Sequence, residues 1–177
     1  MKISTKAIGL FVAVSAVLTA CGGGGSQPAT TTPPKTLQAT ILELESSGKL
    51  PTLDRSASIA GPDANANGIR DDVDAYINNQ GYNAAKLKSA QQTARAIANI
   101  LVVNINNQDE LRATDLSLQK SINCVFSNFA DANQSAVVIK NIEKITANTK
   151  PRVEAYIKYQ IAMDGKVLAS PQGDTCE

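Results

Sequence analysis

Residues 87–105 read LKSAQQTARAIANILVVNI, and this stretch carries the clearest periodic signal of the chain. Its apolar side chains recur at steps of three and four residues. They are Leu87, Ala90, Ala94, Ile97, Leu101 and Ile105. Steps of this size place side chains on one face of an α-helix, and such a face is normally buried. The stretch therefore predicts a long helix that is broken at Asn106-Asn107.

Similar but shorter stripes flank this helix on both sides. We expect helices over residues 35–46, from residue 71 to about 81, from about residue 115, over residues 134–147, and from Thr149 as N-cap to about Gly165. Gly48 ends the first of these, and residues 51–62 form a loop. Because no segment shows convincing period-two alternation, the sequence predicts an all-α antiparallel bundle of five or six helices with short connections.

Each shorter helix has apolar residues that we expect to face inward. They are Leu37, Ile41 and Leu44; Val73, Tyr76 and Ile77; Leu118, Ile122, Val125 and Phe129; Val138, Ile142 and Ile145; and Val153, Tyr156, Ile157 and Ile161. One polar group, Arg152 with Tyr156 and Tyr159, could recognise an anion, although ordinary stacking and solvated packing explain it more simply.

A second pattern lies between the loop and the short helix, where residues 63–74 read DANANGIRDDVD. Oxygen-bearing side chains occupy positions 1, 3, 5, 9 and 12, and a glycine occupies position 6. These residues are Asp63, Asn65, Asn67, Asp71 and Asp74, with Gly68 as the glycine. Ca²⁺ takes six to eight oxygen ligands, including a main-chain carbonyl at position 7, which is Ile69 here. The spacing therefore predicts a calcium site, with Asp72 facing away from it.

This spacing resembles the EF-hand loop, and it is closer still to the dockerin and thrombospondin type 3 calcium loops, which end in Asp. The resemblance covers only residues 63–74, and it implies side-chain ligation by the five residues named above and main-chain ligation by Ile69. Gly61-Pro62 directly before the loop disfavours an entering helix, so the two-helix lever of a calcium sensor is not expected.

The same residues have a simpler interpretation. Asn- and Gly-rich segments form ordinary turns, and aspartates in the first turn of a helix interact favourably with its dipole. Turn formation alone gives no reason for an oxygen at every required position. With three carboxylates and two neutral amides, the site would bind weakly, at about 10⁻⁴–10⁻³ M, which suits a structural ion.

The N-terminus predicts export and lipidation. Residues 1–20 combine Lys2 and Lys6 with an apolar run from residue 7 to 20, which is too short to span a membrane. The run ends in Leu18-Thr19-Ala20-Cys21, which resembles the lipobox of bacterial lipoproteins and implies acylation of Cys21. The alternative is an ordinary secretory signal with a chance cysteine.

Residues 21–35 then form a Gly/Thr/Pro-rich tether, and residues 36–177 form the helical domain. Acyl chains would anchor this domain to a membrane. By the same resemblance, Gly22 after the cysteine favours the outer membrane over the inner one.

The remaining cysteines predict a disulfide. In an oxidising compartment outside the cytoplasm, Cys124 and Cys176 can form one intramolecular bridge, and two free thiols are the alternative. The bridge would hold the loose end of the chain around Pro171 against a helix.

Composition argues against several classes of function. The chain has no histidine, and its 17 basic residues nearly balance its 16 acidic ones. We therefore expect no nucleic-acid partner and no enzyme, since neither Glu43 with Glu45 nor Asp109-Glu110, in an expected loop, forms a positioned acid–base pair. The sequence favours a calcium-binding, membrane-anchored interaction module with a protein or cell-wall partner in the envelope. The alternative is a small-ligand carrier or envelope chaperone that uses a cavity between helices.

Overall fold

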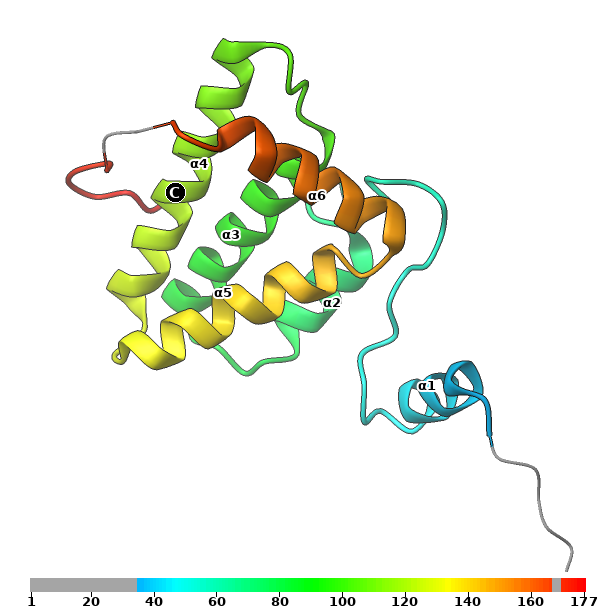
Figure 1. Ribbon diagram of the computed structural model, residues 1–177. Coiled ribbons are helices and arrows are strands. Elements are labelled where there is room, and N and C mark those ends of the chain that lie inside the picture. Colours follow the sequence, from blue (N-terminus) through cyan, green and yellow to red (C-terminus); the bar gives the residue numbers. More distant parts are fainter. Residues whose placement is uncertain (1–34, 167–169) are drawn as a thin grey trace, which may run out of the picture. The chain divides into compact units, whose positions relative to one another are not determined.

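The computed structural model describes residues 35–166 and 170–177, and this part of the chain is helical, with no strand. Its elements, labelled in Figure 1, are α1 (Leu37–Ser46), α2 (Asp71–Asn78), α3 (Ala84–Val102), α4 (Gln108–Asn128), α5 (Ala132–Thr146) and α6 (Lys150–Met163). The predicted all-α bundle of five or six helices is confirmed. Residues Thr36–Glu177 form one compact unit.

Helix α3 is the central element of the bundle. It contacts α2, α4, α5 and α6, and in Figure 1 it runs behind α5 and α6. Ala90, Ala94, Ile97 and Leu101 are buried, as the periodic stripe predicts. The helix ends at Val102, three residues earlier than expected, because Val103 adopts extended backbone angles. Ile105 therefore lies in the connection to α4.

The core contains side chains from five of the helices and from the segment before α2. The larger cluster consists of Ile69, Val73, Ile77, Ala90, Ala94, Ile97, Val125, Phe129, Val138, Ile142 and Ile145. A smaller cluster consists of Ile100, Leu111 and Tyr159. The inward positions predicted for α2, α3 and α5 are thus largely correct.

The start of α4 differs from the prediction. The helix begins at Gln108 and not near Asp115, because the side chain of Asn107 accepts hydrogen bonds from the main-chain N–H groups of Asp109 and Glu110. Asp109 and Glu110 therefore lie in the first helical turn, where acidic side chains are favourable, and not in a loop.

The inward face predicted for α6 is wrong. Val153, Ile157 and Ile161 are exposed, and Arg152 and Tyr159 are the buried residues of this helix. Thr149 is the N-cap as predicted, with a proline in the first turn, but its side chain makes no capping hydrogen bond. The inward face of α1 is also less buried than expected, since Leu37 is exposed.

A disulfide joins the C-terminal segment to the bundle. Cys124 in α4 is bonded to Cys176, with their Cα atoms 5.0 Å apart, as the sequence predicts. Further contacts hold this segment: Gln92 donates from Nε2 to the carbonyl of Thr175 at 2.9 Å, Asn123 of α4 donates to the carbonyl of Pro171 at 3.3 Å, and Arg95 pairs with Glu177. The C-terminal segment is therefore tied to both α3 and α4.

The predicted signal peptide, the acylated Cys21 and nearly all of the tether lie outside the described residues. Within the described part, none of the helices has the length and hydropathy needed to cross a membrane.

Candidate functional site

The loop of residues 63–74 is closed on itself at the point where α2 begins. The N–H of Asp71 donates to the carbonyl of Pro62 at 2.9 Å, and the N–H of Ala64 donates to Oδ1 of Asp71 at 2.9 Å. These two bonds bring together the two ends of the loop. Asp71 is therefore a closing residue of the loop and keeps its second carboxylate oxygen for other contacts.

Side-chain oxygens hold the main chain inside this loop. Asp63 accepts from the N–H groups of Asn67 at 3.1 Å and Gly68 at 2.8 Å, one to each carboxylate oxygen. Oδ1 of Asn65 accepts from the N–H of Asn67, and Oδ1 of Asn67 accepts from the N–H of Ile69. The loop is thus wound around the three oxygen-bearing side chains that the spacing predicts for positions 1, 3 and 5.

Two residues of the loop have left-handed backbone angles. Gly68 has φ = 78°, which glycine adopts without steric cost. Ala66 has φ = 54°, which costs a residue with a Cβ roughly 1–2 kcal/mol. Such strain persists only where the surrounding contacts enforce it, and it is concentrated at ligand-binding and other functional segments.

Asp74, at position 12, is the point on which the loop converges. Its Oδ2 accepts from the amide nitrogens of Asn65 at 3.4 Å and Asn67 at 3.1 Å, and its Oδ1 accepts from Gln91 of α3 at 3.2 Å. The structure therefore brings positions 3, 5 and 12 into direct contact, and Asp63 adjoins them through the main chain of Asn67.

This donor set fits a hard cation in its chemistry, and its present arrangement is a hydrogen-bonded one. The three acids predicted as ligands do not form a cluster that could hold a metal by themselves, and no three Asp, Glu, Cys or His side chains do so in the described part of the chain. Ligation would therefore depend on the amides of Asn65 and Asn67, whose carbonyl oxygens each have a second lone pair. Their NH₂ groups now face Asp74 and would have to turn away from it.

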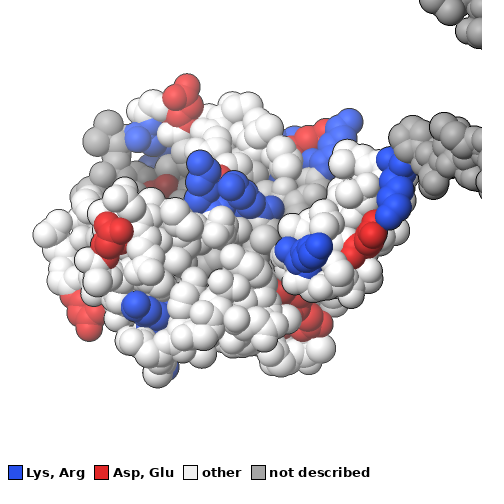
Figure 2. Space-filling model, turned by 90° about the horizontal axis from the view of Figure 1, so that it is seen from below, with Lys and Arg blue, Asp and Glu red and all other residues white. Residues whose placement is uncertain are grey.

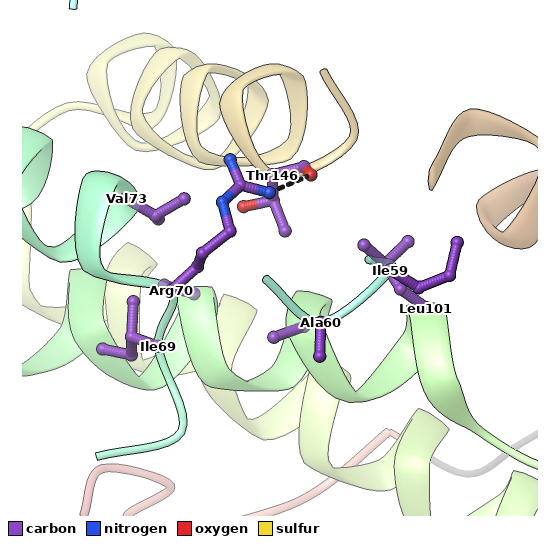
Figure 3. Close-up of a pocket in the computed structure, with 9 residues that line it drawn as sticks. Ile59, Ala60, Ile69, Arg70, Val73, Leu101 and Thr146 are labelled. Carbon is purple, nitrogen blue, oxygen red and sulfur yellow. Dashed lines mark hydrogen bonds between the residues drawn. The ribbon is translucent and has the colours of Figure 1, made fainter. Parts of the chain in front are cut away.

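Ile69 fixes the loop to the core. Its side chain is almost completely buried beside Val73 and Ile77 of α2, while its carbonyl belongs to the loop backbone. Figure 3 shows Ile69 and Val73 near Arg70, around the same small cavity. A change in the loop backbone at this point would therefore be transmitted to the packing of α2.

Arg70 and Asp72 connect the loop to α5. The buried guanidinium of Arg70 forms a bidentate pair with Asp72, with Nε–Oδ1 2.5 Å and Nη2–Oδ2 2.9 Å. It also donates to the carbonyl of Thr146 (Figure 3) and to that of Ile145, both in the last turn of α5, where carbonyls lack helical partners. Asp72 is thus one half of a buried ion pair and more than the dipole partner expected from its position.

A second buried arginine anchors the long connection before the loop. Arg152 is completely buried, and its five donor hydrogens are used in five bonds. The acceptors are the carbonyls of Asp54, Ser58 and Ile59, Oδ2 of Asp54 and Oδ1 of Asn148. Arg152 therefore has no free donor for an external anion and is not solvated, so the anion site and the solvated packing considered from the sequence are both wrong for this residue.

The two arginine pairs meet through Asp54. Its N–H donates to Oδ2 of Asp72 at 2.7 Å, and its carboxylate lies 2.5 Å from Nη2 of Arg152. The hydrogen bond from Arg152 lowers the pKa of Asp54 from 3.8 to about 2. Buried Tyr159 on α6 donates to Asp115 at 2.8 Å, and burial, followed by this bond, raises the pKa of its hydroxyl.

Enclosed space in this region is small. The cavity in Figure 3, lined by Arg70, Thr146 and apolar neighbours, has a volume of about 10 Å³, which is room for about one water molecule. It does not provide the chamber that a small-ligand carrier would need. On the face drawn in Figure 2, basic and acidic side chains lie in small separate groups with uncharged surface between them.

Some residues of this site had no signal in the sequence. Gln91 is 17 residues from Asp74, and only the packing of α3 against α2 brings them together. In the sequence, Arg70 looks like an ordinary surface residue and Arg152 like a candidate anion contact, because nothing local shows that a charged side chain will be buried. Comparisons with protein-family models, curated proteins and solved structures found no match for this chain.

Proposed function

We propose that this chain is an exported lipoprotein, anchored by an acylated Cys21, whose helical domain is a non-catalytic interaction module with a structural Ca²⁺ in the loop of residues 63–74. The observation that carries the calcium assignment is the convergence on Asp74. Asn65 and Asn67 contact this carboxylate directly, at the spacing that the calcium-loop resemblance requires. The module would bind a protein or cell-wall partner in the cell envelope. By the resemblance of its N-terminus, its lipid anchor would lie in the outer membrane.

The surroundings of the loop support a structural role for the ion. The loop joins the connection that Arg152 holds to the first turn of α2, and Ile69 and the Arg70–Asp72 pair fix it to the core and to α5. An ion that links its two ends would add to the alignment of these elements. This arrangement favours stabilisation over signalling, because no helix enters the loop from its N-terminal side.

The first experiment is thermal unfolding of the purified protein with calcium and with a chelator. At about 10 mM free Ca²⁺ and a Kd of about 10⁻⁴–10⁻³ M, binding adds roughly 1.4–2.7 kcal/mol to the free energy of unfolding. We expect the melting temperature to rise by several degrees with Ca²⁺, and to rise by much less with Asp63→Ala.

The quantity to compare between variants is the rise in melting temperature from chelator to calcium, and not the melting temperature itself. Asp63→Ala also removes the acceptor of two loop N–H groups, so it lowers stability in chelator as well. Asp109→Ala is the matched control, since it removes a carboxylate that is almost fully exposed on α4. Equal melting of the wild-type protein in calcium and in chelator would show that the loop is only a hydrogen-bonded turn.

A further inference from the structure

Helix α6 presents an apolar stripe that no described part of the chain covers. Val153, Ile157 and Ile161 are spaced four residues apart and are 41%, 49% and 69% exposed. The opposite face of the helix is the one fixed to the body, by Arg152 and Tyr159. A contiguous stripe of large apolar side chains on a folded surface indicates a contact with another molecule.

The charges at the two ends of this stripe are of opposite sign. Lys150 lies seven residues before Ile157, and Asp164 lies seven residues after it. A seven-residue spacing keeps all three on one seam of a helix that packs at a shallow angle against another. Both end residues are exposed, and the contact that Lys150 makes within the chain is a loose pair with Glu154 at 3.7 Å.

This order of side chains is complementary to itself. In an antiparallel pair of α6 helices related by a two-fold axis at Ile157, Val153 faces Ile161 of the second copy and Ile157 faces its own equivalent. Lys150 then faces Asp164 of the second copy, and the same pairs occur again on the other side of the axis. An isologous interface requires this reciprocity, in which residue i contacts j and j contacts i.

We propose that the exposed face of α6 is a homodimer interface, occupied by α6 of a second copy of this chain in antiparallel orientation. The charge order favours this occupant, because the exposed Lys150 and Asp164 at opposite ends of the stripe can both pair only with a surface that carries the opposite charges in the reverse order, and a second copy does so. A seam of one 14-residue helix is small, so the association in solution is weak. Confinement of tethered copies at a membrane would raise their effective concentration. The interface does not depend on calcium at residues 63–74.

The two-fold axis allows a direct test by cross-linking. In the full chain carrying Cys21→Ser, which removes the thiol outside the disulfide, we expect Ile157→Cys to form a covalent dimer on mild oxidation, because the two thiols meet at the axis. Val137→Cys is the matched control, since Val137 is a similarly exposed apolar residue on α5. Cross-linking of Ile157→Cys no faster than that of Val137→Cys would overturn the proposal.

Charge reversal tests the orientation of the helices. By sedimentation equilibrium, we expect Lys150→Glu and Asp164→Lys each to weaken dimerisation by about tenfold, because each change places like charges together at both symmetric sites. The double variant restores the opposite pairs and should dimerise close to the wild-type level. All of these positions are exposed, so folding is preserved, and circular dichroism verifies it. A double variant as weak as the sum of the single ones would contradict the antiparallel arrangement.

Discussion

At the scale of single residues, two buried arginines fix the long non-helical connection between α1 and α2 to the helices. Arg152 satisfies the carbonyls of Asp54, Ser58 and Ile59, which have no helix or sheet partners. Arg70 does the same for the last carbonyls of α5. Buried main-chain carbonyls are costly without partners, so each guanidinium replaces the regular hydrogen bonding that a loop lacks.

Arg152→Met therefore should destabilise the domain strongly. The substitution keeps much of the volume but leaves the Asp54 carboxylate without its charged partner and the carbonyls of Ser58 and Ile59 without the guanidinium donor. Removal of one member of a buried pair costs about 3–5 kcal/mol. We expect this loss in the free energy of unfolding by urea. Arg112→Met is the control, because Arg112 is exposed and its pair with Asp109 is 3.5 Å long. Similar midpoints for the two variants would show that the Arg152 network contributes little.

The same ion pair predicts a response to acid. The pKa of the Asp54 carboxyl is about 2 in the folded protein, below the usual 3.8, because Arg152 donates to it. The folded state therefore binds this proton less readily than the unfolded state does. The contribution of this group to stability is therefore fully present above about pH 4 and is lost as the pH falls towards 2. In urea unfolding between these pH values, Asp54→Asn should show a shallower fall in stability than the wild-type protein. Parallel curves for the two proteins would contradict this assignment.

At the scale of elements, the sequence predicts helices well where one apolar stripe is buried against the rest of the body. Helices α3 and α5 follow this rule, and their buried residues include most of those with the three-and-four spacing. The rule fails for α6, because Arg152 and Tyr159 determine its inward face through partners that, apart from Asn148, are 44 or more residues away. A local pattern cannot show that a charged side chain will find five acceptors.

The loop of residues 63–74 shows the same division. Its closure and its side-chain-to-main-chain bonds lie within the loop, so the spacing of Asp and Asn residues contains them. Its attachment is not local: Gln91 of α3 and the end of α5 reach it only in the folded chain. Asn107 followed by Asp109 and Glu110 is an N-cap pattern that marks the start of α4 in the sequence. A search for apolar stripes misses this start, because Leu111 is the only large apolar residue in the first two turns of the helix.

At the scale of the whole domain, the disulfide connects the C-terminal segment to α4, and its loss should lower the free energy of unfolding of the whole domain. Cys124 and Cys176 are 52 residues apart, and closing a loop of that length restricts the unfolded chain by about 4 kcal/mol in the chain-entropy model. We expect the double variant Cys124→Ser with Cys176→Ser to lose roughly this amount in urea unfolding.

Gln92 reports whether the C-terminal segment stays in place in that variant. Its side chain is buried and donates to Thr175, so a released segment would leave it without that partner. Gln92→Leu should therefore destabilise the oxidised protein but have little further effect in the double variant. Additive losses would show that the segment stays in place without the bridge.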